Sequence, residues 1–346
     1  MGTVRWRSTR IELDSEGRSV AYTLPDGSRW QHRLEDETGD LLAVDGPEGL
    51  SWQIEPDARG NPLAITAPGG GITRYAYDDA QLPDRPTRIT DPDGGERSLQ
   101  WNRLGQLVRH TDCSGHATEY AYDREGRLIR ETNALSQLTR YGWDGERIGC
   151  EQTHATTTAV LYEPGSFVPL LRIAQPTPQP EAGELAAFLA QHGQARIEPD
   201  TPAQAQIGLY LTDHLGTPLR LLDPQGQTLW QAEPDDWGAT THATGIRQPI
   251  RFQGQWDDEE SGLYYNRYRH YDPGMGRYVT QDPIGIEGDA NAYIYPINPL
   301  HGVDPLGLQE VFAFRLQPRL PVERRTHRRT RPGLVDPGRR PYPGSE

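Results

Sequence analysis

Two aspartates near the C-terminal end of the sequence stand in similar surroundings and could do acid–base chemistry. Asp282 is followed by Pro-Ile-Gly, and Asp304 is followed by Pro-Leu-Gly-Leu. Two carboxyl groups that share one site cannot both ionise cheaply, so one stays protonated as an acid while the other activates water as a base. Asp-Pro pairs are also common turn sequences, and Asp91, Asp223 and Asp336 each precede a proline as well. From the spacing alone, a catalytic pair and a set of ordinary turns both remain open.

The residues after Asp304 favour a chain that folds back on itself. Pro305 fixes its own φ angle, and Gly307 permits a sharp turn. Such a turn can bring the Asp304 carboxylate close to the backbone that follows it. A group held against its own chain gains the effective concentration of an intramolecular reaction.

Other clusters of chemically active residues are weaker. His110, Cys113 and His116 have spacing that could suggest a metal site, but they fall at a turn without a fourth ligand nearby. The residues around Asp91 faintly resemble a calcium loop without its bidentate glutamate. The sequence contains no phosphate-binding loop, dinucleotide fingerprint or GxSxG motif. We therefore expect no metal and no cofactor.

The elements that must position these side chains follow an internal repeat. An aromatic residue before Asp or Asn recurs at intervals of 24, 21 and 21 residues, at Tyr77, Trp101, Tyr122 and Trp143. The segments RLIRET and TEYAYD alternate polar and apolar residues, which is typical of strands. Gly and Asp or Asn supply tight turns between them. One hairpin cannot bury its own apolar face, but stacked hairpins can, so the sequence predicts a continuous β-sheet.

Composition and charge agree with a β-rich body. The 346 residues include 37 Gly and 30 Pro, and the net charge is −14, which makes nucleic acid an unexpected partner for the body. Residues 309–346 hold nine Arg against four acidic residues. This basic tail has no Cys and is too short to build a core, so we expect it to be disordered and at most a weak binder of nucleic acid. No Sec-type signal and no membrane-spanning run is expected.

Residues 175–205 interrupt the repeat. Proline-rich flanks enclose a stretch, residues 181–192, that is predicted to be helical and to end at Gly193. We interpret this segment as an insertion loop or linker, and the alternative is a helix that binds a partner.

The repeats resemble the YD repeats of Rhs proteins and of the C components of insecticidal Tc toxins. The sequence from Leu209 is more specific, because about a hundred residues resemble the RHS conserved region and the Rhs repeat-associated core domain. Its landmarks are residues 213–218, 237–238, 262–265, 267–273, 276–278, 282–285, Asn291, Tyr293, Tyr295, 298–299 and 304–308.

The resemblance implies both a fold and a reaction. Members of the family build a hollow β-shell, and their core domain cuts the chain just after the DPxGL motif to release a C-terminal toxin. Carried over to this sequence, the cut falls between Leu308 and Gln309. The carboxylates are Asp282 and Asp304, and the basic partner is Arg269. The chain would thus be a single-turnover aspartic autoprotease.

We expect an all-β chain, a curved sheet of YD-repeat hairpins forming part of a shell, with four regions. Residues 1–150 carry the hairpins, 151–208 a divergent repeat and the insertion, 209–308 the conserved region and core domain, and 309–346 a truncated toxin tip. Expected partners are the tail as cargo, a secretion spike and an immunity protein, with no membrane. The expected location is the bacterial cytoplasm before export by a specialised secretion system. The alternatives are a non-catalytic scaffold that binds a cell-surface ligand or a partner, and an inactive orphan relic.

Overall fold

The computed structural model describes residues 10–16, 18–23, 27–177, 205–235, 237–240, 242–285, 292–295, 302–308 and 311–312. All of them belong to one compact unit, Met1–Ala313, and a second unit, Phe314–Glu346, lies outside the described residues. The described part consists of strands, turns and one short 3-10 helix, η1 (Pro47–Gly49). The prediction of an all-β chain is confirmed.

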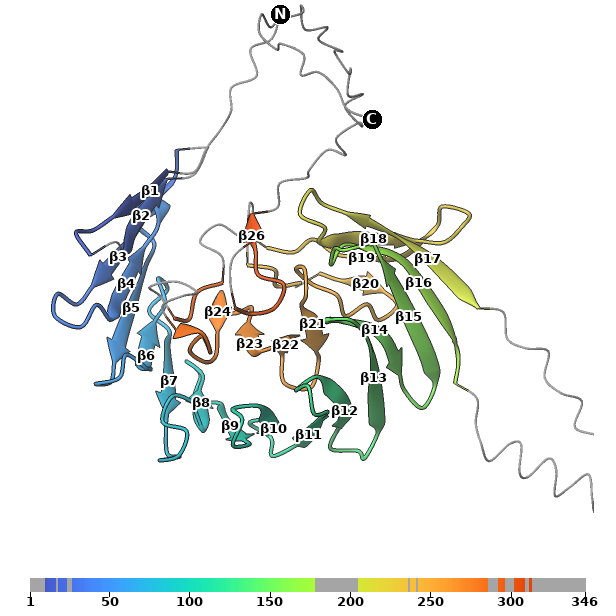
Figure 1. The fold of residues 1–346 in the computed structure, drawn as a ribbon, viewed down its shortest axis with the longest axis horizontal. Coiled ribbons are helices and arrows are strands. Elements are labelled where there is room, and N and C mark those ends of the chain that lie inside the picture. The colour runs from blue at the N-terminus through green and yellow to red at the C-terminus, as the bar shows by residue number, and fades with distance from the viewer. Residues whose placement is uncertain are drawn as a thin grey trace, which may run out of the picture. The chain divides into compact units, whose positions relative to one another are not determined.

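Twenty strands form one antiparallel sheet in which each strand pairs with the next along the chain. Figure 1 shows this sheet curving in a broad arc, as the resemblance to Rhs proteins implies. Within the described residues β1 pairs only with β2 and β20 only with β19, so the sheet is open. The strands are β1 (Arg10–Leu13), β2 (Ser19–Thr23), β3 (Arg29–Leu34), β4 (Leu41–Asp45), β5 (Ser51–Pro56), β6 (Pro62–Thr66), β7 (Ile72–Ala76), β8 (Arg88–Thr90), β9 (Glu96–Trp101), β10 (Leu107–Thr111), β11 (Ala117–Tyr122), β12 (Leu128–Thr132), β13 (Leu138–Asp144), β14 (Arg147–Gln152), β15 (Thr156–Tyr162), β16 (Pro169–Pro176), β17 (Gln206–Thr212), β18 (Pro218–Leu222), β19 (Thr228–Gln231) and β20 (Thr244–Gly245).

The acidic or amide residue of each repeat forms the turn that joins two strands. Asp123 Oδ1, for example, accepts hydrogen bonds from the backbone N–H groups of Glu125, at 3.0 Å, and Arg127, at 2.8 Å. Gly126 takes the left-handed conformation that this turn requires, with φ of +75°. Asp and Asn recur at this position because their side-chain oxygen can accept hydrogen bonds from the backbone N–H groups of the turn.

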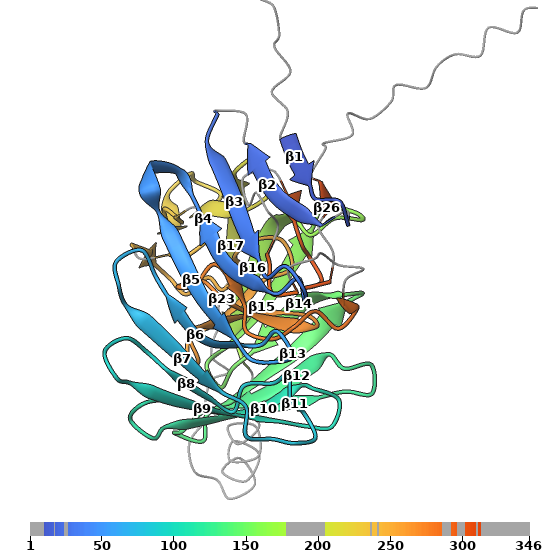
Figure 2. The ribbon, with the colours of Figure 1, turned by 90° about the vertical axis from the view of Figure 1, so that its left-hand side faces the viewer.

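The aromatic residue of each repeat ties neighbouring strands together. Tyr122 Oη donates to the carbonyl oxygen of Leu107 at 2.8 Å, and Trp143 Nε1 donates to that of Leu128 at 2.7 Å. Tyr and Trp both combine a large apolar body with a donor at the far end, so either residue can fill this position. Figure 2 shows how the joined strands succeed one another across the sheet.

A second, four-stranded antiparallel sheet lies on the concave side of the large sheet (Figure 1). A two-stranded pair, β25 and β26, follows it in the chain. The strands are β21 (Trp256–Asp258), β22 (Leu263–Asn266), β23 (Arg269–Asp272), β24 (Arg277–Tyr278), β25 (Gly302–Val303) and β26 (Val311–Phe312).

One hydrophobic core joins the two larger sheets. Its buried members include Leu107, Tyr120 and Leu128 from the large sheet, and Trp256 and Tyr265 from the small sheet. Burying these aromatic and aliphatic side chains removes apolar surface from water. This hydrophobic effect is the main contribution that holds the small sheet against the large one.

Arg267 fastens the hairpin between β22 and β23 to the large sheet. Its φ of +57° is unusual for a residue other than Gly. Its buried guanidinium donates to the carbonyl oxygens of Gly126, at 3.0 Å, and Glu125, at 2.8 Å, and forms a 2.6 Å ion pair with Glu146. These contacts hold a strained turn in place, and the turn carries Asn266 and Arg269 on its two sides.

Two predictions fall largely outside the described residues. They are the helix at residues 181–192 and the disordered tail at 309–346, of which only the strand β26 is described. In the described part of the chain no helix is long and apolar enough to cross a membrane.

Candidate functional site

Three separate segments bring Arg269, Asp282 and Asp304 together. Arg269 begins β23, directly across the two-residue hairpin from Asn266. Asp282 follows β24 and is fixed by its backbone N–H, which donates to the carbonyl oxygen of Ala292 at 2.8 Å. Asp304 directly follows β25. The residues that the resemblance to Rhs proteins implied therefore lie in one place.

Arg269 is the centre of this arrangement. Its Nη2 atom lies 2.9 Å from Asp282 Oδ2 and 3.2 Å from Asp304 Oδ2. Its Nε donates to the carbonyl oxygen of Gly307 at 2.6 Å, and its Nη1 to that of Ala292 at 3.1 Å. Because the planar guanidinium presents several donors in fixed directions, one side chain holds both carboxylates and the backbone.

The Asp304 carboxylate shapes the turn that follows it. Its Oδ1 accepts hydrogen bonds from the N–H groups of Gly307 and Leu308, both at 2.9 Å. Gly307 has a φ of +72°, and a Cβ there would lie 2.7 Å from the backbone oxygen of Asn266. Only Gly fits this position, so the predicted sharp turn is present and brings the carboxylate to its own backbone.

The second carboxyl group, Asp282, has a perturbed proton affinity. Burial raises its pKa above the ordinary value, and the nearby Arg269 guanidinium opposes that rise. Asp282 Oδ1 also accepts a 3.0 Å hydrogen bond from the N–H of Ile284. A buried carboxyl group with a raised pKa holds its proton to a higher pH than an ordinary aspartate does, and can act as an acid.

The strands β25 and β26 enclose the bond at which the sequence predicts a cut. Gly302 pairs with Phe312, and Val303 with Val311, so residues 304–310 connect two paired strands. Leu308 lies in this connection, and Gln309 is outside the described residues.

Asn266 and Tyr278 belong to this site, although the sequence analysis did not single them out. Tyr278 Oη donates to Asp304 Oδ2 at 3.0 Å, and its ring lies 3.6 Å from the guanidinium carbon of Arg269. Asn266 Nδ2 donates to the carbonyl oxygen of Asp304 at 2.8 Å and to Tyr278 Oη. Both residues lie within motifs of the core-domain resemblance or next to them, and this was the one available signal.

The arrangement as a whole excludes bulk solvent. Asn266, Arg269 and Asp304 are at most 3% exposed, and Asp282 is 8% exposed. In such surroundings charge interactions are stronger than in water. The site combines two carboxyl groups, a fixed cation and a tightly held turn, and these are the parts that acid–base cleavage of a peptide bond requires.

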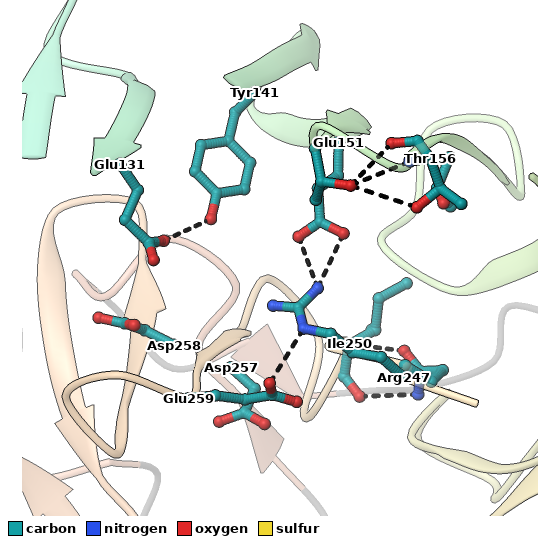
Figure 3. Close-up of polar contacts among 12 residues, drawn as sticks. Glu131, Tyr141, Glu151, Thr156, Arg247, Ile250, Asp257, Asp258 and Glu259 are labelled. Carbon is teal, nitrogen blue, oxygen red and sulfur yellow. Dashed lines mark hydrogen bonds and ion pairs between the residues drawn. The ribbon is translucent and has the colours of Figure 1, made fainter. Parts of the chain in front are cut away.

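A second polar cluster lies between the large sheet and β21 (Figure 3). Arg247 Nη1 contacts both carboxylate oxygens of Glu151, at 2.7 and 2.8 Å, and its Nε lies 3.3 Å from Glu259. Burial, together with the neighbouring Asp258 carboxylate, raises the pKa of Glu131 to about 8. These groups join the two sheets, and within the described residues no three or more His, Cys, Asp or Glu side chains form a metal site.

His110, Cys113 and His116, whose spacing could suggest a metal site, do not form one group of ligands in the described part of the chain. His110 is buried, while Cys113 and His116 are exposed at the turn between β10 and β11. His116 Nδ1 lies 3.2 Å from Asp112 Oδ2, so its nearest acidic partner is part of its own turn.

Comparison with known proteins identifies the repeats. The family model of the RHS repeat matches residues 57–96 and 101–137, and the model of the RHS protein matches residues 207–243. The solved TcdB2-TccC3-TEV structure aligns with 86% of this chain and 19% of its own, at 17% identity and a TM-score of 0.46.

Curated relatives match longer stretches of the chain. Toxin protein Tse5 of Pseudomonas aeruginosa is 52% identical over 155 residues, which are 43% of this chain and 12% of Tse5. Double-stranded DNA deaminase toxin A of Burkholderia cenocepacia is 30% identical over 328 residues, which are 88% of this chain and 21% of that toxin. The chain thus spans a small part of these relatives. From its repeats and these matches, the chain belongs to the Rhs family of YD-repeat polymorphic toxins.

Proposed function

We propose that this chain is the C-terminal region of an Rhs-family toxin that encloses its own C-terminal segment and releases it by cutting between Leu308 and Gln309. Residues 1–150 and 151–208 supply most of the wall, residues 209–308 supply its last strands and the core domain with the protease site, and residues 309–346 are the released segment. The observation that carries this proposal is the contact of one guanidinium, Arg269, with both carboxylates and with the backbone two residues before the proposed bond.

The proposed reaction is hydrolysis by a pair of carboxyl groups. Water adds to the carbonyl carbon of Leu308, and its proton passes to the Asp304 carboxylate. The bond to the nitrogen of Gln309 then breaks, and this nitrogen takes a proton from Asp282. The raised pKa of Asp282 favours the protonated form that this step needs. The products are a carboxylate at Leu308 and an amine at Gln309.

Arg269 acts in this proposal by holding the reacting groups. It keeps the two carboxyl groups close together and fixes the Gly307 carbonyl beside them. The strands β25 and β26, which precede and follow the bond, pair with each other. The bond to be cut is therefore held near the carboxyl groups and does not have to find them by diffusion. This is the advantage of an intramolecular reaction. The site acts once per chain.

The partners in this proposal follow from the family. The released segment is the cargo, a secretion spike carries the toxin out of the bacterial cytoplasm, and an immunity protein protects the producing cell. The relatives whose names specify an activity include a DNA deaminase toxin and probable deoxyribonucleases.

The experiment compares the full chain with single Asp→Asn variants. The wild-type chain should yield a small fragment whose N-terminal sequencing begins at Gln309, and Asp282→Asn and Asp304→Asn should abolish it. Asp223→Asn is the matched control, because Asp223 also precedes a proline and bonds its own turn, through the N–H groups of Gln225 and Gln227. Cutting that persists in both site variants, or an uncut wild-type chain, contradicts the proposal.

A further inference from the structure

Asn266 carries a polar atom that the contacts described so far do not use. The residue is fully buried. Its two side-chain N–H groups donate to the carbonyl oxygen of Asp304 and to Tyr278 Oη. Among the residues that the structure describes, no group donates to its Oδ1. A buried acceptor without a partner is costly, so a donor bound at this atom would be stabilising.

The contacts of Asn266 fix which way its amide faces. The carbonyl oxygen of Asp304 can only accept a hydrogen bond, so it must face the nitrogen of the amide and not the oxygen. Tyr278 Oη spends its proton on Asp304 Oδ2 and can accept from the same nitrogen. An exchanged amide would lose the bond to the Asp304 carbonyl oxygen, and Tyr278 Oη could donate to it only by giving up its bond to Asp304 Oδ2. Oδ1 therefore faces away from these two partners and is open to a donor.

The hairpin that carries Asn266 borders the turn that precedes the bond to be cut. The backbone oxygen of Asn266 borders Gly307, where no Cβ would fit. The next residues along the hairpin contact the same turn, since the N–H of Tyr268 lies 3.2 Å from the carbonyl oxygen of Leu306. Hydrolysis needs one water molecule, and the burial of Arg269 and Asp304 keeps bulk water away. A single bound water is the donor that fits.

We propose that Asn266 binds and orients the hydrolytic water through its side-chain oxygen. One proton of that water bonds to Oδ1, which directs a lone pair of the water oxygen at the carbonyl carbon of Leu308. The other proton passes to the Asp304 carboxylate as the new C–O bond forms. Breaking of the C–N bond and protonation of the Gln309 nitrogen follow. This inference rests on the proposed autoproteolysis and names the residue that supplies its nucleophile.

Two variants separate water binding from a purely structural role. Asn266→Leu is close to Asn in size but has no acceptor, and it should slow cutting at Leu308 by about 100-fold or more. Asn266→Asp keeps an acceptor oxygen but loses the donors to Asp304 and Tyr278. If the acceptor matters, Asn266→Asp should cut at least about tenfold faster than Asn266→Leu. If Asn266 acts only by donating, the two variants should be equally slow, and that result overturns the inference.

The rates are measured on the full chain after its folding has been verified by thermal melting. Cutting of Asn266→Leu at the wild-type rate also overturns the inference, while the autoproteolysis itself stands. An uncut wild-type chain refutes the proposed function instead, so the two failures are distinguishable.

A second measurement needs no change at Asn266. A crystal structure of the uncut Asp304→Asn chain should show an ordered water within about 2.7–3.2 Å of Asn266 Oδ1. A protein donor at that atom would contradict the inference. This measurement decides the question even if the Asn266 variants do not fold.

Discussion

Arg269 donates a 2.6 Å hydrogen bond from Nε to the carbonyl oxygen of Gly307, a residue 38 positions further along the chain. The same guanidinium contacts the carboxylates of Asp282 and Asp304. Its position depends on the large sheet, because the hairpin that carries Arg269 is fastened to the sheet through Arg267. The repeats thus help to hold the site in place.

Replacing Arg269 should destabilise the fold strongly. Arg269→Met leaves the buried Asp304 carboxylate without its cation, and breaking a buried pair in this way costs about 3–5 kcal/mol. Urea unfolding measures the change. Arg109→Met is the control, since Arg109 forms an exposed ion pair with Glu119, which is worth about 0–1 kcal/mol. Equal losses in the two variants would contradict the central position of Arg269.

Gly254 should be required for the position of the turn after Asp304. A Cβ at Gly254 would lie 1.9 Å from the carbonyl oxygen of Pro305. Gly254→Ala must therefore displace the turn, and we expect both a lower melting temperature and loss of cutting. Gly262 is the matched control, because it has a similar positive φ but no atom within 4 Å of the position of its Cβ. Gly262→Ala should cost about 1 kcal/mol and leave cutting intact.

Stability should fall as the pH rises through the titration of Glu131. The unfolded chain releases this proton near pH 4.3, roughly the ordinary value for Glu, whereas the folded chain keeps it up to about pH 8. Between these values the folded chain binds more protons, so the free energy of unfolding decreases with rising pH, by at most about 1.4 kcal/mol per unit.

Glu131→Gln should remove this dependence of the free energy of unfolding on pH, and it should stabilise the chain at pH 8 and above. The amide can still accept the hydrogen bond that Tyr141 Oη donates to Glu131 at 2.7 Å. Urea unfolding at several pH values measures the slope, and Glu119→Gln, at an exposed position, is the control. An unchanged slope in Glu131→Gln would show that Glu131 is not the group that titrates.

The rate of cutting should fall as the pH is raised. Burial raises the pKa of Asp282, and in the proposed reaction only its protonated form supplies the leaving amine with a proton. Rates of cutting measured over a pH series should therefore decline as the pH rises through that raised pKa. A rate that increases steadily with pH would assign the decisive step to another group.

The repeats could be read from the sequence because their chemistry is local. The alternation in RLIRET and TEYAYD predicts strands, and β12 and β11 lie there. The Asp of each aromatic–Asp pair bonds the turn that follows it, as Asp123 does. Interactions within a few residues suffice for these elements. The curvature of the sheet depends on packing against the inner strands and was expected only from the resemblance.

The site could be predicted only in part, because it depends on contacts between distant segments. Asp304 and its turn have a local signal in Pro305 and Gly307. Asn266 and Tyr278 give no such signal, since Tyr278 reaches Asp304 across 26 residues and Asn266 reaches it across 38. Contacts between residues so far apart cannot be predicted from the spacing of residues in the sequence.

Glu131 was also missed. It occupies an inward-facing position in a strand, where an acidic residue is unexpected, and this break in the pattern was the available signal.

The most direct test of the account is the intact mass of the full chain during refolding from denaturant. The account predicts that a fragment ending at Leu308 appears with a first-order rate that does not depend on protein concentration, because each chain cuts itself. A folded chain that stays at full length, a cut at another bond, or a rate that rises with concentration would contradict it.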